Sequence, residues 1–400
     1  MDTTPNSKSY DIVIIGGAIM GSSTAWWLTE ISDFDGSVLV VERDSSYEFT
    51  STARTNSCIR QQFSNEINVK ISQFGAEFIQ NLKGFMKDDR IPNMPIQNYG
   101  YLYLADNQDF ANTLKINQKF QTALGAETEI LSAEEIGDRY PFYNVDDIVL
   151  GSINRKDEGY FDGGGLFDWF RRSARDRGIE YIENEVVEIS TDAGKVTSIS
   201  LKSGEVIACG QVVNACGPRA AITSQMAGLD VPVEPRKRFT WIFSAERPLD
   251  QDLPLTIDPS GIHLRQDGPK TYLAGGRSLG PDDPPEFDDF VMDHSLWEEH
   301  IWPTIATRIP QFEAIKVINE WAGHYEYNTL DQNAILGCHP DLPNFIFQNG
   351  FSGHGLQQSP AMGRATAEWL TYGEYRTLDM TPFAYERVLC NAPFVEKAVI

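Results

Sequence analysis

The chain opens with a glycine-rich turn between two short apolar segments, and this feature constrains the fold most. Residues 10–15 read as a buried strand, and a turn from Gly16 to Gly21 follows directly. A helical pattern comes next, and a second apolar segment, residues 38–41, ends at Glu42. Strand, glycine turn, helix, strand and a terminal acid in this spacing are typical of a dinucleotide-binding βαβ unit.

Each part of this unit has a physical role. Gly16 permits the tight turn, and Gly21 lets the helix pack close to the strand. The helix N-terminus offers unpaired N–H groups to a pyrophosphate, and Glu42 can accept hydrogen bonds from ribose hydroxyls. One departure is Ala18, which stands where the middle glycine of the motif is usual. A glycine turn in an ordinary α/β unit is the plainer alternative.

The motif alone leaves NAD and FAD open as the cofactor. Its position near residue 10 of a 400-residue chain is typical of FAD proteins, which bind adenine with the N-terminal part and close the site with the C-terminal part. The length also predicts two lobes rather than one core.

Composition excludes several classes of protein. A net charge of −24 disfavours binding to nucleic acid or anionic membranes and keeps the chain in solution. An acidic face that docks a basic protein electron acceptor is the sharper alternative. The five cysteines have no metal-ligand spacing, so we expect no metal site. No apolar segment is long enough to span a membrane, and no targeting signal precedes the first strand, so we expect a cytoplasmic protein.

The rest of the chain alternates strands and helices. We expect a long helix over residues 67–86, strands over 181–189 and 317–321, and a loop at 281–285. Residues 211–217 form an apolar strand that ends in small residues, where backbone can approach a cofactor or simply turn. A glycine-rich turn at 350–355 precedes a helix over 356–370, whose N-terminus suits a negative charge on a reduced flavin. We interpret His354 in this turn as a structural hydrogen-bonding group rather than a base.

These segments together resemble the D-amino-acid-oxidase-like flavoprotein superfamily, which includes sarcosine oxidases and glycine oxidase. The residues that carry the resemblance are 16–25 with Glu42, 212–217 and 350–363. Residues 61–64, 233–238, 321–323, 327–333 and 350–358 are more similar to a family of FAD-dependent oxidoreductase domain proteins that assist assembly of mitochondrial respiratory complex I, and to its bacterial relatives.

The resemblance implies an α/β fold: a split Rossmann-like FAD-binding domain plus an α+β substrate domain with a large, mainly antiparallel sheet. The FAD-binding domain is expected at residues 1–88, 151–230 and 323–400, and the substrate domain at 89–150 and 231–322. We expect non-covalent FAD, and hydride transfer from the carbon next to an amine nitrogen to flavin N5, followed by imine hydrolysis.

The residues expected to contact the cofactor come from the motif, the polar segment after it, and the two later turns. They are Gly16, Gly17, Ala18, Ile19, Met20, Gly21, Glu42, Arg43, Thr52, Ala53, Arg54, Val187, Ala215, Gly217, Gly350, Ser352, Gly353, His354, Gly355 and Leu356.

The resemblance also suggests residues for the substrate site. The arginine that binds a substrate carboxylate in sarcosine oxidase corresponds to Arg60, and the second carboxylate ligand, a lysine there, is Gln357 here. This change disfavours a simple substrate such as sarcosine. The cysteine that holds covalent flavin falls near His324, so cysteinyl attachment is not expected, although histidyl attachment at His324 stays open. The lysine that activates oxygen is expected near residues 272–277, where Arg277 is the cation.

Aromatic residues on expected strands suggest a wall over the flavin ring that suits an alkylammonium group. Tyr325 and Tyr327 belong to it, with Trp321, Tyr99 and Tyr101, although aromatic residues in strands are more often plain core. Three functions stay open. The first is oxidation of a small amine, most simply an N-substituted (N-methyl or opine-like) amino acid, by a dehydrogenase rather than an oxidase. The others are a non-catalytic FAD-containing assembly factor and a 2-hydroxy acid dehydrogenase with His354 or His324 as base.

Overall fold

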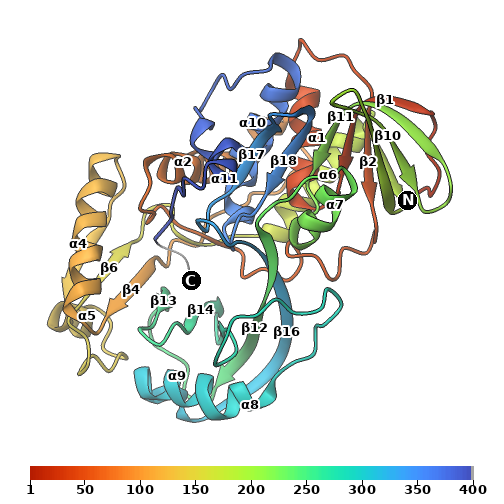
Figure 1. Ribbon diagram of the computed structural model, residues 1–400. Coiled ribbons are helices and arrows are strands. Elements are labelled where there is room, and N and C mark those ends of the chain that lie inside the picture. Colours follow the sequence, from red (N-terminus) through yellow and green to blue (C-terminus); the bar gives the residue numbers. More distant parts are fainter. Residues whose placement is uncertain (398–400) are drawn as a thin grey trace.

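The computed structural model describes residues 1–397 and contains two eight-stranded sheets (Figure 1). Strands of the first sheet come from residues 9–42, 180–214 and 335–349, and strands of the second from 101–154, 233–276 and 315–328. The chain therefore passes between the two sheets several times. The predicted α/β class, with a split nucleotide-binding part, is confirmed.

The first sheet is mainly parallel around its centre. Its order is β17-β18-β11-β1-β2-β8, with β10 and β9 attached at β11. β1 pairs in parallel with both β2 and β11. The bounds are β1 (Ser9–Ile15), β2 (Val38–Glu42), β8 (Glu180–Glu183), β9 (Val186–Asp192), β10 (Lys195–Leu201), β11 (Val206–Asn214), β17 (Ile335–His339) and β18 (Leu342–Asn349).

Buried helices cover one face of this sheet. They are α1 (Ile19–Glu30), α2 (Glu66–Gln80), α6 (Gly163–Asp176) and α10 (Gly355–Tyr372). α1 is buried nearly all round because it packs between α6 and α10. Ser23 Oγ donates to the Ser359 carbonyl at 2.7 Å, and a Cβ at Gly363 would lie 2.1 Å from Ser23 Oγ. Small residues therefore set the close crossing of α1 and α10.

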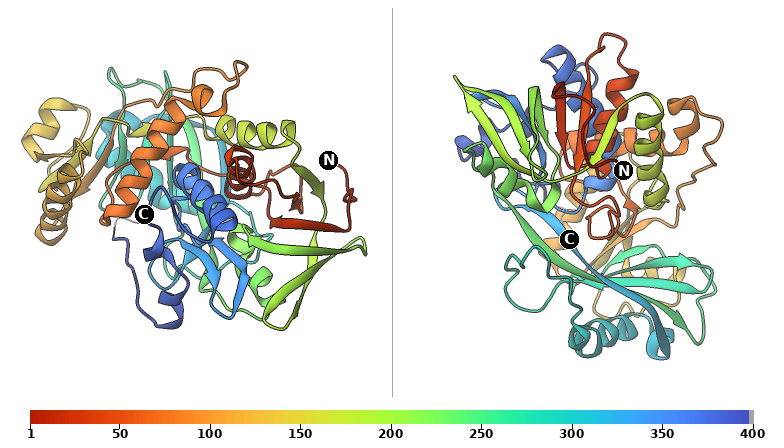
Figure 2. Two further views of the ribbon diagram at one scale, coloured as in Figure 1. Left: turned by 90° about the horizontal axis from the view of Figure 1, so that it is seen from above. Right: turned by 90° about the vertical axis from the view of Figure 1, so that its right-hand side faces the viewer.

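The second sheet is mainly antiparallel and has the order β16-β12-β15-β14-β13-β4-β6-β5. The bounds are β4 (Tyr101–Ala105), β5 (Glu129–Ser132), β6 (Leu150–Asn154), β12 (Val233–Ala245), β13 (Leu255–Ile257), β14 (His263–Gly268), β15 (Thr271–Gly276) and β16 (Ile315–Asn328). β12 and β16 are long and pair from Val233–Asn328 to Ala245–Ile315. Figure 2 shows these two strands running from the first sheet to the far end of the molecule.

Further helices and a small sheet complete the fold. α8 (His294–Leu296) and α9 (Trp302–Arg308) lie at the far end of β12 and β16 (Figure 1). The remaining ones are α3 (Leu82–Met86), α4 (Gln108–Ala123), α5 (Ala133–Arg139), α7 (Ala220–Met226), α11 (Glu386–Leu389) and the small sheet of β3 (Cys58–Ile59) with β7 (Gly159–Tyr160).

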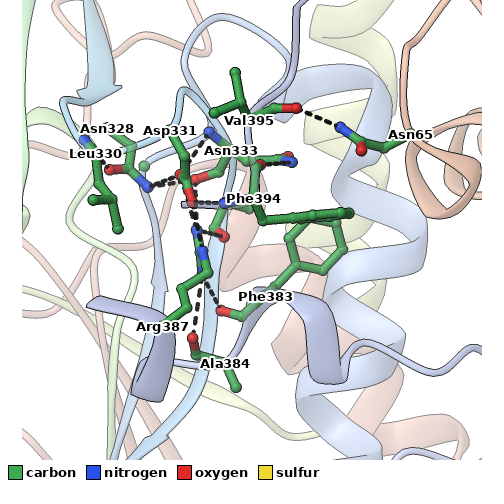
Figure 3. A network of polar contacts seen from close by, with 12 residues as sticks. Asn65, Asn328, Leu330, Asp331, Asn333, Phe383, Ala384, Arg387, Phe394 and Val395 are labelled. Atoms are coloured by element: carbon green, nitrogen blue, oxygen red, sulfur yellow. Dashed lines mark hydrogen bonds and ion pairs between the residues drawn. The ribbon is translucent and has the colours of Figure 1, made fainter. Parts of the chain in front are cut away.

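A buried polar network fastens the segment that follows α10 (Figure 3). Asp331 Oδ2 accepts a hydrogen bond from Arg387 Nε at 2.6 Å and from the Phe394 backbone N–H at 2.9 Å. Asn65, just before α2, donates through Nδ2 to the Val395 carbonyl at 2.9 Å. The network thus connects the C-terminal segment to the end of β16 and to the start of α2.

The structure differs from the sequence-based elements in three places. The helix expected over 67–86 is two helices, α2 and α3, because Asn81 caps the first and its side chain donates to the Glu77 carbonyl at 2.9 Å. The strand expected over 181–189 is β8 and β9, which pair with different neighbours. The strand at 317–321 is the middle of the longer β16, while residues 281–285 form the expected loop.

The expected domain boundaries stay a prediction, although two strands cross them. β6 begins at the boundary expected at residue 150 and continues in the second sheet, and β16 continues past residue 322. Among residues 1–397, no helix is long and apolar enough to cross a membrane.

Candidate functional site

A large cavity lies at the junction of the two sheets. It is lined by the turn between β1 and α1, by residues at the ends of β2 and β11, by β12 and β16, and by the turn before α10. The expected cofactor residues that line it are Gly16, Ala18, Ile19, Met20, Glu42, Arg43, Thr52, Arg54, Ala215, Gly217, Ser352, Gly353, His354, Gly355 and Leu356. Segments far apart in the sequence therefore meet at one site.

The turn at the end of β1 accepts only glycine at two positions. Gly16 has φ +99°, and a Cβ there would lie 2.4 Å from the Ala215 carbonyl oxygen. A Cβ at Gly21 would lie 1.9 Å from the Gly16 carbonyl oxygen. Because backbone atoms cannot yield at such distances, the turn stays narrow and leaves its N–H groups near the cavity.

The N-terminus of α1 opens into this cavity. Ala18 at the N-cap provides no side-chain acceptor, and the Ile19 N–H donates to Thr52 Oγ1 at 3.3 Å. A helix N-terminus without a capping side chain is suited to a phosphate group. This arrangement fits the pyrophosphate of a dinucleotide.

Glu42 occupies the end of β2 as expected. Its Oε2 accepts from the Gly17 N–H at 2.9 Å, and its Oε1 accepts from the Asp44 N–H at 3.0 Å. Burial raises the pKa of this carboxyl above its ordinary value, whereas the backbone donors lower it. The acid is held rigidly where it can accept hydrogen bonds from a ribose.

Several expected cofactor residues lie outside the cavity lining. Gly17 and Gly21 act through the turn itself, and Gly350 lies behind Glu326 and donates to its side chain. Ala53 is exposed. Val187 is also exposed, and its neighbour Val186 lines the cavity instead, because successive residues of a strand face opposite sides.

Arg60 also lines the cavity, with 2% of its surface exposed. Its guanidinium donates to the Tyr103 hydroxyl and, at 2.7 Å, to His354 Nε2. Gln357 accepts from the Arg60 backbone N–H at 2.8 Å through Oε1. The expected residues Arg60, His354 and Gln357 are therefore brought into direct contact by β3 and α10.

The partner of His354 defines its tautomer. Arginine has no acceptor, so His354 Nε2 must accept, and the ring proton resides on Nδ1. Burial first, and the charge of Arg60 second, hold the pKa of His354 well below its usual value. His354 is a neutral ring with its acceptor nitrogen occupied, which agrees with the structural role expected from the sequence.

A buried acid supports the Arg60 loop from behind. Glu158 is fully buried and accepts from the Gln61 N–H at 2.6 Å and from Gln62 Nε2 at 2.9 Å. Burial raises the pKa of Glu158 to about 8. No sequence motif pointed to this acid.

Other expected substrate residues are dispersed. Arg277 is exposed and outside the cavity, and Tyr327 is likewise not in its lining. Tyr325 and Tyr101 do line the cavity, so part of the expected aromatic wall is present. The exposed Arg277 is unsuited to a buried anion site, because strand β15 ends before it and the chain turns outward into a loop.

His324 lines the cavity next to the loop at 281–290. Its ring stacks on Phe290 with centroids 4.4 Å apart, and its Nε2 lies 2.8 Å from the Asp289 carbonyl oxygen. Arg238 forms two 2.8 Å hydrogen bonds to Asp282 of the same loop. The loop is therefore fastened over the cavity by β12 and β16.

One histidine of the cavity, on β14, was not predicted from the sequence. His263 is buried in the cavity lining, and burial lowers its pKa to about 4. Asn56 Nδ2 lies 2.7 Å from His263 Nε2, and Thr240 donates to Asn56 Oδ1 at 3.2 Å. The pairing of β14 with β13 and β15 places this residue in the cavity lining, and no strand was predicted there from the sequence.

The narrow turn at Gly16, the rigidly held Glu42 and the open N-terminus of α1 together define a dinucleotide-binding oxidoreductase site. The residues present fit FAD. Residues 11–369 match the family model described as FAD dependent oxidoreductase. The chain belongs to this family of D-amino-acid-oxidase-type flavoproteins, and FAD is its cofactor.

Similar proteins span most of the chain. FAD-dependent oxidoreductase domain-containing protein 1 of Xenopus laevis is 34% identical over 98% of this chain and 85% of its own length. Mitochondrial sarcosine dehydrogenase of Mus musculus is 26% identical over 92% of this chain and 40% of its own length. Among solved structures, L-proline dehydrogenase from P. horikoshii has a TM-score of 0.82 and 25% identity, covering 96% of this chain and 98% of that one.

Proposed function

We propose that this protein is a dehydrogenase that oxidises the C–N bond of a small N-substituted amino acid, with FAD as the hydride acceptor. The observation that carries the proposal is the buried Arg60 guanidinium in the wall of the FAD cavity. The other observations concern the amine, the proton and the final electron acceptor.

Arg60 suits a substrate carboxylate. Its planar N–H groups match the two oxygens of a carboxylate, and the aromatic rings of Phe63 and Tyr101 lie 4.4 and 5.4 Å from its Cζ. These rings exclude water, and an ion pair gains strength where water is excluded. A substrate that carries a carboxylate would be oriented here.

The names of two similar proteins support a secondary amine as the substrate. Sarcosine dehydrogenase and L-proline dehydrogenase are named for substrates whose amine nitrogen carries a second carbon. Gln357, which is uncharged and bonded to the Arg60 backbone, leaves one cation rather than two at this end. We infer a substrate with one carboxylate in this part of the site and an N-substituent directed along the cavity.

The chain has to bind, orient and desolvate the substrate. FAD supplies the hydride acceptor when bound. A neutral amine can lose hydride from its α-carbon without a strong base, and His354 is neutral with Nε2 already accepting from Arg60. Loss of hydride leaves an iminium ion, which takes up water and releases the carbonyl product, an amine and a proton.

The electron acceptor is inferred from the cations of the site. No lysine is among the described residues that line the cavity, and Lys270 is exposed. A lysine ammonium beside the flavin would favour reaction with oxygen by stabilising superoxide. We therefore favour a dehydrogenase, and the net charge of −24 suits a basic protein acceptor.

The test is anaerobic reduction of the bound flavin, followed by its visible absorbance. The panel contains N-methyl amino acids, L-proline, opine-like secondary amines, D-amino acids and 2-hydroxy acids. We expect rapid bleaching by a secondary amino acid and slow reoxidation when air is admitted. Bleaching by hydroxy acids alone would indicate a 2-hydroxy acid dehydrogenase. A flavin that no compound bleaches would favour the alternative of a non-catalytic FAD-containing assembly factor.

A further inference from the structure

A second buried acid lies in the wall of the FAD cavity, on β16. Glu326 is 8% exposed and lines the cavity, yet its side chain has one hydrogen bond among the described residues. Its Oε2 accepts from the Gly350 N–H at 3.1 Å. By contrast, Glu42 uses both oxygens for backbone donors, and Glu158 accepts three hydrogen bonds. No hydrogen bond is seen for the second carboxyl oxygen of Glu326 among the described residues, although the residue lines the cavity.

The position of Glu326 connects two segments that build the cofactor site. Its backbone carbonyl accepts from the Ser352 N–H at 3.0 Å, so it is fixed to the turn before α10. Cys216, which follows β11 and lines the same cavity, donates through Sγ to the Ile15 carbonyl at 3.2 Å. Glu326 therefore faces the cavity between the turn at Gly16 and the turn at 350–355.

The environment of Glu326 favours the neutral acid. Burial raises its pKa to about 8, and the Gly350 N–H opposes this only in part. A buried carboxyl without a cation keeps its proton near neutral pH, and a protonated carboxyl can donate an O–H hydrogen bond. Such a donor in a cofactor cavity needs an acceptor oxygen.

We propose that Glu326 is a cofactor-binding residue that donates its O–H to an oxygen of the ribityl–pyrophosphate part of FAD. This part of FAD offers hydroxyl and phosphate acceptors. The turn at Gly16, on one side of Glu326, suits the pyrophosphate, and the turn at 350–355, on the other side, suits the flavin ring, so the part of FAD that joins them would pass Glu326. Ionisation of Glu326 would remove the donor and place a negative charge beside the phosphates, so FAD would bind less tightly.

Several ionisable groups lie around Glu326, and a variant of Glu326 alone separates its effect from theirs. Cys216 has its pKa raised by burial to about 12, so it is neutral. Arg236 and Glu234, on the paired strand β12, bond to each other at 2.7 Å. Arg219, after β11, pairs with Asp288 at 3.1 Å. Two further ionisable residues line the same cavity. They are Glu42, at the end of β2, and the neutral His354, in the turn before α10.

The experiment measures FAD release from the holoprotein after dilution, between pH 6 and pH 10, by the fluorescence of free FAD. For the wild-type protein we expect the dissociation constant to be constant below about pH 7. It should rise above about pH 8 by up to about tenfold per pH unit, since one proton is linked to binding. Glu326→Gln keeps a donor but cannot ionise, so its FAD affinity should lose this pH dependence.

Two further variants separate cofactor binding from a purely structural role. Glu326→Leu removes the donor, so we expect at least about tenfold weaker FAD binding at pH 7, with unchanged far-ultraviolet circular dichroism. Glu185→Gln is the matched control. Because Glu185 lines the cavity, a second control is Glu374→Gln. Glu374 lies outside the cavity lining and is bonded to Arg376 at 3.2 Å, so this variant should keep the wild-type profile. A wild-type profile that is flat, or that Glu326→Gln reproduces, would overturn the proposal, as would full FAD affinity in Glu326→Leu.

Discussion

At the scale of single residues, burial decides which ionisable groups of the cavity carry charge. Arg60 stays charged because no environment in a protein deprotonates a guanidinium. His354 and His263 are neutral because burial and neighbouring arginines oppose a second positive charge. The site therefore presents a cation for an anionic group and neutral rings beside it, which suits binding and orientation more than proton transfer.

The role of Arg60 can be tested at this scale. Arg60→Ala should lower kcat/KM for a carboxylate substrate by about 100-fold or more, since two charged hydrogen bonds of about 1.5–3 kcal/mol each are lost. The loss should appear mainly in KM, with FAD still bound. Steady-state kinetics on the substrate that bleaches the flavin would measure it. Arg277→Ala, which removes an exposed arginine, is the matched control, and equal kinetics in both variants would contradict the assignment.

At the scale of elements, the turn between β1 and α1 is the most tightly specified part of the site. Gly16→Val would place a branched side chain against the Ala215 carbonyl oxygen, which is only 2.4 Å from an added Cβ. Residue 16 also has a φ of +99°, which a valine rarely adopts. We expect purified Gly16→Val protein to lack the flavin absorbance band. Gly84→Ala, in α3, has nothing within 4 Å of the added Cβ and should stay fully loaded. A yellow Gly16→Val protein would refute the placement of the cofactor.

The C-terminal segment supports a second prediction at this scale. Asp331 and Arg387 form a buried ion pair at 2.6 Å, with side chains 0% and 8% exposed (Figure 3). Asp331→Asn leaves the Arg387 charge poorly compensated, which should lower the free energy of unfolding by about 3–5 kcal/mol. Urea unfolding with excess FAD would measure it. Glu374→Gln breaks the exposed pair with Arg376 and should cost under about 1 kcal/mol. Equal losses in the two variants would show that the network does not hold this segment.

At the scale of the whole molecule, the cavity exists because two sheets meet. The first sheet supplies the turn and the acid for the dinucleotide, and the second supplies Tyr101, His263 and Tyr325. A loop at 281–290, fastened through Asp282 and Arg238, closes one side. Cytoplasmic location and a protein electron acceptor stay predictions, because neither depends on a contact within this chain.

The sequence by itself determined the features that depend on local chemistry. The βαβ unit could be predicted because glycines, apolar runs and Glu42 are close together in the chain, and because backbone crowding at Gly16 allows no other residue. The glycine-rich turn at 350–355 could be predicted for the same local reason, and the resemblance then indicated Arg60. Val187 stays a prediction as a backbone contact of the cofactor, although the side chain at the cavity is that of its neighbour Val186.

The tertiary structure alone decided what depends on neighbours far apart in the sequence. Glu158, His263 and Glu326 lie in segments without a motif, and only their burial beside the cavity gives them altered pKa values. Arg277 appeared well placed from the sequence, yet β15 ends before it and leaves it exposed. Desolvation and pairing are properties of an assembled environment, and a linear sequence specifies that environment only through the fold.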